Sequence, residues 1–389
     1  MRTKQNSIYN FSVALFLYTT LIVDLYRKIG GGGIELVRNL FYIIIFGLIL
    51  IDIIKSKRTT KIFILGFLVS LFFLISSQIN FGHNSIYIST WIFFISRLLP
   101  AYYTGRYTEN WDDVSKYVSN LSWLALIYAI IAITSPYDNT SNAYATIGTN
   151  LVFVSFINIR YAIKNHKTIY IIIGLICLTA VLFLGTRAVF VGALLSIVLT
   201  ILLFINNLSK TTKILSWIIL IFILLIIVLS FTTITETLVE FFPNSRTLKM
   251  LSSGDMLDDS NRSDGFYSEL INSLSLHPFK IYGFLGDRIY LAGYCATEDT
   301  ILSSFSHNVI LELCMNFGVF PGIILSLYFL GLLLSCCSKC YKKNTTINYI
   351  FLSSLGITFV NMMISSSYLS SYYIWFLYGI AYKIIKSKL

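Results

Sequence analysis

The chain has 389 residues, 56% of them hydrophobic, and its mean hydropathy is +0.76. Charged residues make up only 12%, about half of the roughly 25% found in soluble globular domains, which excludes an ordinary soluble protein. The net charge of +11 would suit a nucleic-acid-binding protein, but in a membrane protein it is typical of basic cytoplasmic loops, so no nucleic-acid partner is predicted.

Apolar runs of about 20 residues recur along the whole chain, and each is long enough to cross a bilayer as a helix. They predict an all-α polytopic membrane protein with about twelve transmembrane helices. In chain order the predicted spans are residues 8–24, 35–54, 61–77, 85–103, 117–134, 146–163, 168–184, 188–205, 214–232, 308–335, 348–365 and 369–385. The first run has basic residues before it but no small-residue cleavage site after it, so it is predicted to be an uncleaved span rather than a signal peptide.

Basic residues orient these spans, because cytoplasmic loops are enriched in Lys and Arg. With twelve alternating spans, nineteen of the 29 basic residues fall on one side, and this predicts that both termini are cytoplasmic. The nineteen are Arg2, Lys4, Lys55, Lys57, Arg58, Lys61, Arg106, Lys116, Arg160, Lys164, Lys167, Lys210, Lys213, Lys339, Lys342, Lys343, Lys383, Lys386 and Lys388.

One connection is too long to be a simple turn. Residues 233–306 form a polar stretch of about seventy residues, predicted to be external, which holds 10 of the 18 acidic residues. Loops of this length are usually functional. Within it, Phe266, Leu270, Ile271 and Leu274 have helical spacing, which predicts a short amphipathic helix lying at the membrane surface.

Two arginines are predicted on the outer side, where the orientation rule disfavours them. Arg187 follows Gly185 and Thr186, which interrupt the apolar run and predict a helix start, and Arg262 precedes the amphipathic helix. Arginine beside the free N–H groups of a helix N-terminus makes a good phosphate site. The alternative, which charge alone leaves open, is a pair of interfacial arginines that reach lipid headgroups.

A histidine stands at the start of the tenth predicted span, in "SHNVILELCMNFGVFPG". At an outer helix N-terminus the dipole favours the neutral imidazole, and a neutral His307 can accept a proton from a hydroxyl. The alternative is a simple capping region, in which Ser306 or Asn308 closes the helix and His307 has no role.

Three segments of the chain resemble motifs of the O-antigen ligase and O-antigen polymerase family. They are "GTRAVF", "NRSDGFYSELINSLSLHPFKIYGFLGDR" with Gly283 and Gly286, and "SHNVILELCMNFGVFPG" with Gly318 and Gly322. They stand in the family's order around one large external loop and cover roughly residues 170 to 335. The turn before Arg187 lacks the family's frequent serine, and Pro321 interrupts the last glycine pair.

The resemblance implies a GT-C-like fold and a glycosyltransferase that polymerises repeat units carried on undecaprenyl diphosphate, for O-antigen or capsule, at the outer face of the bacterial inner membrane. It divides the chain into N-terminal helices (1–167), a core (168–335) and C-terminal helices (336–389). It implies a lipid-linked glycan donor, a glycan acceptor and membrane lipid as partners, together with a chain-length regulator and a flippase.

The resemblance also implies the site. Its catalytic residues would be Arg187 and Arg262, which bind the donor diphosphate, and His307, which assists the acceptor hydroxyl. The predicted substrate-binding residues are Asn308, Asp264, Glu269, Tyr267 and Arg288. No cofactor or metal is expected; "GDMLDD" offers Asp255, Asp258 and Asp259, but the spacing fits neither Asp-x-Asp nor an EF-hand.

Two other functions stay open. An O-antigen ligase would move the glycan to lipid A core or another acceptor, and the sequence does not identify the acceptor. A flippase or transporter of lipid-linked oligosaccharide also commonly has twelve spans, but it should have matching halves and charges near the membrane midplane. No halves match here, and Asp24, Asp52, Arg97 and Glu312 are predicted to lie toward span ends.

Overall fold

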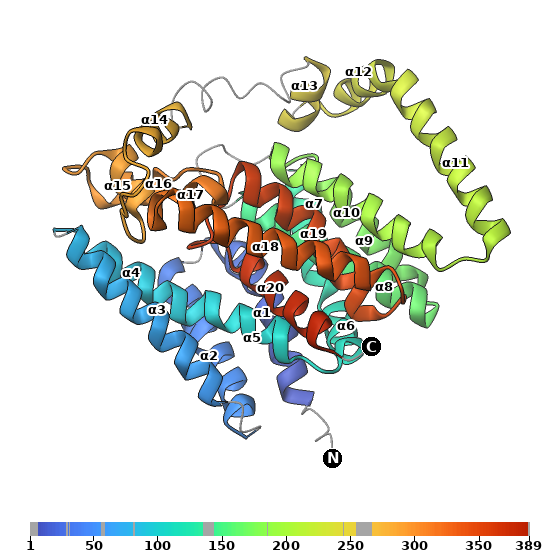
Figure 1. The fold of residues 1–389 in the computed structure, drawn as a ribbon. Helices are drawn as coiled ribbons and strands as arrows, with labels where there is room; N and C mark the ends of the chain where they lie inside the picture. The colour runs from blue at the N-terminus through green and yellow to red at the C-terminus, as the bar shows by residue number, and fades with distance from the viewer. Residues whose placement is uncertain are drawn as a thin grey trace. The chain divides into compact units, whose positions relative to one another are not determined.

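The computed structural model describes residues 7–28, 30, 32–55, 59–80, 82–134, 144–184, 186–243, 245–253 and 267–387. Every regular element among these residues is a helix, and they contain no strand (Figure 1). This confirms the prediction of an all-α protein.

The helices follow the predicted spans closely in the first half of the chain. They are α1 (Ser7–Lys28), α2 (Ile34–Lys55), α3 (Thr59–Ile79), α4 (Asn84–Phe93), the π-helical turn η1 (Phe94–Leu98), α5 (Leu99–Tyr107), α6 (Trp111–Asn120), α7 (Ser122–Thr134), α8 (Tyr144–Asn165), α9 (Thr168–Ala180) and α10 (Arg187–Asn206).

The second half contains both long helices and the short helices of the predicted loop. They are α11 (Lys210–Leu229), α12 (Phe231–Phe241), α13 (Arg246–Ser252), α14 (Ser268–Leu276), α15 (Gly286–Ala292), α16 (Glu298–Ser303), α17 (Val309–Phe317), α18 (Val319–Cys340), α19 (Thr346–Ile364) and α20 (Tyr372–Lys386). The amphipathic helix predicted in the loop is α14, in which Leu270 and Leu274 are buried and Ile271 is exposed.

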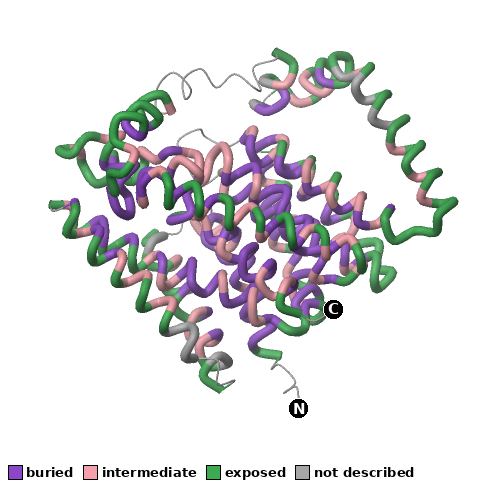
Figure 2. Tube along the Cα trace, in the orientation of Figure 1, coloured by how far each residue is buried: buried purple, intermediate pink, exposed green. Residues whose placement is uncertain are grey.

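Every predicted span contains at least one helix, but five of the described helices are by themselves long and apolar enough to cross a membrane: α1, α8, α10, α18 and α19. The bent pair α6 and α7, which meet at 50°, would be a sixth. The chain is therefore a helical protein with several helices suited to a membrane, and the count of twelve stays a prediction. The apolar faces of α11 and α18 are largely exposed, as expected of helices that face lipid (Figure 2).

Besides the span predicted at 117–134, which the bent pair α6 and α7 divides, two further predicted spans differ from a single straight helix. The span predicted at 308–335 is two helices, α17 and α18, because Gly318 between them has a φ of +88°, which ends α17. The span predicted at 85–103 is the run α4–η1–α5, and Arg97 lies in its π-helical middle. The prediction that Arg97 lies toward a span end is therefore wrong. Asp24 does lie near the end of α1, and the side chain of Asp52 lies outside the described part.

The chain forms two compact units, each built from three separate segments. The first unit comprises residues 1–45, 108–258 and 337–360, and the second comprises 46–107, 259–336 and 361–389. The divisions predicted at 167 and 335 from the motifs stay predictions.

In the first unit, small residues bring α10 and α19 into close contact. A Cβ on Gly192 would lie 2.7 Å from the Cα of Ile357, and one on Gly356 would lie 2.4 Å from the N of Ser196. The hydroxyl of Ser196 donates to the carbonyl of Ser353 across the same contact, at 2.6 Å. Close backbone approach at small residues is the usual way in which membrane helices pack.

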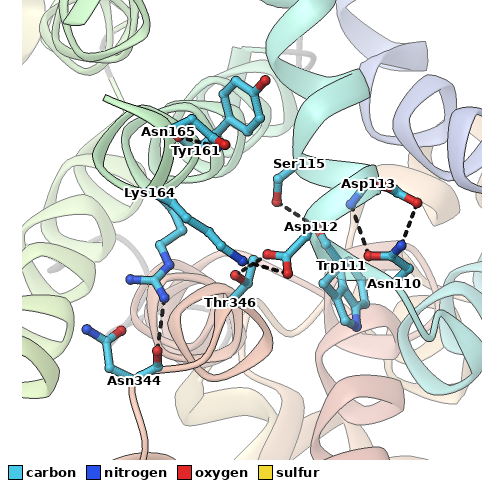
Figure 3. Close-up of polar contacts among 11 residues, drawn as sticks. Asn110, Trp111, Asp112, Asp113, Ser115, Tyr161, Lys164, Asn165, Asn344 and Thr346 are labelled. Atoms are coloured by element: carbon cyan, nitrogen blue, oxygen red, sulfur yellow. Dashed lines mark hydrogen bonds and ion pairs between the residues drawn. The ribbon is translucent and has the colours of Figure 1, made fainter. Parts of the chain in front are cut away.

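Polar contacts tie three connections together at one end of this unit (Figure 3). Asp112 at the start of α6 pairs with Lys164 near the end of α8, at 2.7 Å, and accepts from the hydroxyl of Thr346 at 2.6 Å. Arg160 donates to the carbonyl of Asn344 at 2.9 Å. The three connections are those predicted from their basic residues to be cytoplasmic, so the contacts support a common side for them.

The second unit is held by α5 against α20 and by a folded-back loop. Gly105 and Gly379 face each other, and a Cβ on either would lie 2.3 Å from a carbonyl oxygen of the opposite helix. Beyond them, Tyr282 and Gly283 donate backbone N–H bonds to Met315 and Asn316, at 3.2 and 3.1 Å. The loop that precedes α15 is thereby attached to the end of α17.

Candidate functional site

His307 occupies the turn directly before α17. Asn308 is the N-cap of this helix, and its side-chain oxygen accepts from the N–H groups of Ile310 and Leu311, at 2.9 and 3.2 Å. His307 is half-buried and has a φ of +52°, in the left-handed region that few residues with a Cβ adopt. Of the two capping residues that the alternative interpretation named, Ser306 and Asn308, the helix uses Asn308, and the residue with the left-handed backbone beside it is the histidine.

The residues on both sides of His307 are anchored. The N–H of Ser306 donates to Oδ2 of Asp287 at 3.1 Å, and Asn308 Nδ2 donates to the carbonyl of Met363 at 3.2 Å. The rings of Phe305 and His307 lie with their centroids 3.9 Å apart. Hence the turn that carries His307 is fixed to α15 through one neighbour and to the end of α19 through the other.

A buried polar cluster lies behind this turn and consists of Asp287, Arg288, Glu312, Ser367 and Tyr368. Ser367 is its centre: its hydroxyl donates to Oε1 of Glu312 and accepts from Nη2 of Arg288 at 2.9 Å. The second carboxylate oxygen of Glu312 accepts from the N–H of Tyr368 at 3.0 Å. The cluster joins α15, α17 and the connection between α19 and α20.

Arg288 also reaches the turn itself. Its Nη1 donates to the carbonyl of Leu302 at 3.1 Å, and its guanidinium carbon lies 5.5 Å from the ring centroid of Phe305. Phe305 thus contacts both the guanidinium of Arg288 and the imidazole of His307. Arg288 is only 5% exposed, so the contacts described for it are internal.

The cluster contains two carboxyl groups and one guanidinium. Burial raises the pKa of Asp287, although Arg288 and the N–H of Ser306 oppose the shift. A single cation balances a single carboxylate, so burial favours a state in which one of the two carboxyl groups is protonated.

The hairpin of α3 and α4 supports the same region from the other side. Asn80 donates to the carbonyl of Tyr282 at 2.7 Å, the hydroxyl of Tyr87 donates to the carbonyl of Phe284 at 2.5 Å, and Phe284 N donates to the hydroxyl of Ser76 at 2.9 Å. Connections predicted to be external thus meet at one end of the second unit, which supports a common side for them.

The structure places five of the predicted site residues in the second unit. His307, Asn308 and Arg288 belong to the region described above. Tyr267, half-buried, and Glu269, exposed, lie at the start of α14. The roles predicted for Tyr267, Glu269, Asn308 and Arg288 in binding substrate stay predictions.

The other predicted site residues are not described together with His307. Arg187 is the first residue of α10, as the sequence predicted, with Thr186 before it, and it belongs to the first unit. Arg262 and Asp264 lie outside the described residues, as do the acidic Asp255, Asp258 and Asp259. In the part of the chain that is described, no group of three His, Cys, Asp or Glu residues is arranged to hold a metal ion.

Sequence reasoning missed Asp287, Glu312 and Ser367. Glu312 did carry a signal, because an acidic residue within an apolar run such as "VILELCMNF" usually has a functional or paired role. Asp287 and Ser367 carry no such signal, since their partners are distant in sequence.

No family model and no curated protein matches the chain, so the resemblance to the O-antigen ligase and polymerase family stays a prediction.

Proposed function

We propose that this chain is a membrane glycosyltransferase that polymerises oligosaccharide repeat units carried on undecaprenyl diphosphate, at the outer face of the bacterial cell membrane. The observation that carries the proposal is the half-buried His307, fixed in a left-handed turn before the capped helix α17. Strained residues that are anchored on both sides are common at functional sites, and an imidazole is the side chain best suited to take a proton near neutral pH.

In this reaction the bond between the anomeric carbon and the phosphate oxygen breaks, and its electron pair leaves with the diphosphate. The acceptor hydroxyl forms the new glycosidic bond and transfers its proton to His307. Arg187 and Arg262 neutralise the charge that develops on the leaving diphosphate. Each hydrogen bond to a charged group contributes about 1.5–3 kcal/mol, so two arginines can supply binding and part of the barrier reduction. The lipid diphosphate itself provides the driving force.

The test is extension of an undecaprenyl-diphosphate-linked oligosaccharide by the purified full chain in nanodiscs. We expect His307→Asn to lower kcat by about a hundredfold or more, as the loss of a general base does. Arg187→Ala and Arg262→Ala should lose extension as well, while all three variants keep their expression. Asparagine is chosen at position 307 because it tolerates the left-handed conformation. Full activity in all three variants would refute the site.

The products separate the polymerase from the ligase. A polymerase gives longer chains that are still attached to the lipid diphosphate, whereas a ligase gives one transfer to an acceptor without diphosphate, such as lipid A core.

Activity should be unchanged by EDTA. A strong metal requirement would instead favour a metal site that includes Asp255 and Asp258.

A lipid-linked oligosaccharide flippase is the second candidate, favoured by Arg97. This arginine is 9% exposed and lies in the middle of the helical run 84–107, and ionisable residues within membrane spans often mark a transport path. Proteoliposomes that translocate a labelled lipid-linked oligosaccharide without extending it would favour the flippase. Extension without translocation would exclude it.

A further inference from the structure

The turn that carries His307 is attached to the protein through charged and polar groups of α15. Asp287 accepts from the N–H of Ser306, and Arg288 contacts both Leu302 of α16 and Phe305 of the turn. Asp287 and Arg288 are consecutive in α15, so one short helix contacts the turn at two residues and the helix before it at a third.

Ser367 is the group that holds Arg288 and Glu312 together. Its hydroxyl accepts from Arg288 Nη2 and from the N–H of Leu369, at 2.9 and 3.1 Å, and donates to Glu312. Ser367 is fully buried and stands in the sequence "SSSYLSS" between α19 and α20. Its partners are 79 and 55 residues away, so the hydroxyl joins three distant segments of the second unit.

Burying this cluster costs free energy of folding, which argues that the cluster has a function other than stability. Two carboxyl groups and a guanidinium removed from water seldom contribute more stability than apolar residues of the same size would. Here the cluster lies directly behind a half-buried histidine in a strained backbone conformation. Precise location of a reactive group is what such preorganised buried networks provide.

We propose that Ser367, Arg288 and Glu312 are positioning residues that set the orientation of His307 toward the acceptor hydroxyl. The catalytic meaning of this inference rests on the function proposed above, but the positioning itself does not. Ser367 acts through Arg288 and Phe305 on one side of the turn, and through Glu312 and the start of α17 on the other. None of the three needs to touch the substrate.

The first experiment measures the rate at which diethyl pyrocarbonate modifies His307 in the full chain, by mass spectrometry. His277 of the same unit and His166 of the first unit serve as internal references. In Ser367→Ala the buried cluster behind the turn loses its central hydroxyl, and we expect His307 to react about fivefold faster or more, with both references unchanged. An unchanged rate at His307 would overturn the proposal.

Ser326→Ala is the matched control. Ser326 is also a buried serine of the second unit, but its hydroxyl donates to the carbonyl of Gly322 in its own helix, at 2.8 Å. It should leave the reactivity of His307 as it is. If Ser367→Ala does not fold, Arg288→Gln decides, because it removes the guanidinium that contacts both Ser367 and Phe305. It should raise the rate at His307 in the same way.

The second experiment measures extension kinetics of the same variants. Ser367→Ala should lower kcat about tenfold or more with little change in KM, and the loss should vanish in the His307→Asn background, because residues that act through one group are not additive. Losses that simply add would overturn the proposal. If the wild-type chain extends nothing, the proposed function fails, and the modification rates still test the positioning alone.

Discussion

The side chain at position 307 combines a reactive group with an unusual backbone. A left-handed conformation costs a residue with a Cβ roughly 1–2 kcal/mol, and glycine or asparagine would occupy the turn more easily. The adjacent Asn308 is the residue that the helix requires, since its oxygen caps two N–H groups of α17. A histidine in the neighbouring strained position is therefore not explained by the helix start, which weakens the interpretation of His307 as a residue without a role.

Asp287 gives the fold a pH dependence with a definite sign. Burial raises its pKa above the ordinary value, against the opposing effects of Arg288 and the N–H of Ser306. Between the ordinary and the raised value the native protein holds a proton that the unfolded chain has lost, so stability falls as the pH rises through this window. The groups that face Asp287 are Arg288 and Ser306.

We therefore expect the detergent-solubilised protein to melt at a lower temperature at pH 8 than at pH 5.5, by on the order of 5 °C. Asp287→Asn, which cannot ionise, should flatten this dependence in a series of melting curves. Glu269→Gln, at an exposed position of the same unit, is the control. An equally steep dependence in Asp287→Asn would show that other groups cause it.

For single residues, the sequence predicted the features that depend only on nearby residues in the chain. Asn308 as a cap and Arg187 as a first helical residue follow from local rules, and both are confirmed. The cluster of Arg288, Glu312 and Ser367 could not be predicted from the sequence. A hydrogen bond between residues 79 positions apart depends on how the whole chain folds. Whether Arg187, Arg262 and His307 share one site stays a prediction.

Among the elements, the pair α17 and α18 differs most from the predicted single span. Gly318 ends the first helix, and the second turns back so closely that Gly322 contacts the backbone of α17. Gly318 and Gly322 therefore have a structural role: the first ends α17 and the second permits close packing of α18 against it. Hydrophobicity alone could not reveal the break, because the apolar run continues through it.

Gly322→Ala tests this contact. The new Cβ would lie 2.5 Å from the Cα and 2.6 Å from the N of Cys314, and backbone atoms cannot give way as a flexible side chain can. We expect a loss of about 1–3 kcal/mol, seen as a lower melting temperature. Gly331→Ala, on the same helix with no atom within 4 Å of the added Cβ, should be neutral or slightly stabilising. Equal effects at both glycines would contradict the contact.

For the whole molecule, the prediction that can be tested most directly is the side of each connection. The contacts of Asp112 with Lys164 and Thr346 require three connections of the first unit to share a side. In the second unit, the contacts of Tyr282 and Phe284 with the α3–α4 hairpin likewise require the loop before α15 and the α3–α4 connection to share a side. Both demands agree with the alternation derived from basic residues, although which side is cytoplasmic stays a prediction.

Single-cysteine labelling measures on which side of the membrane each connection lies. Cys295 is exposed in the predicted external loop, so in a chain whose other five cysteines are replaced by serine, a membrane-impermeant maleimide should label it in intact cells. Cysteines placed at Lys342 or Asn165 of the Cys295→Ser chain should react only after the membrane is opened. Labelling of all three from the same side would overturn the twelve-span arrangement.

The π-helical turn η1 has an evolutionary consequence. A π turn holds one residue more than the α turn that it replaces, and η1 carries Arg97 between two regular helices. Deleting one residue from 94–98 would turn the π turn back into an α turn, so the flanking helices would keep the faces that they now present. Homologous chains with a one-residue gap at this place would therefore keep both flanking helices in register and would differ in the side chain that lies where Arg97 now lies.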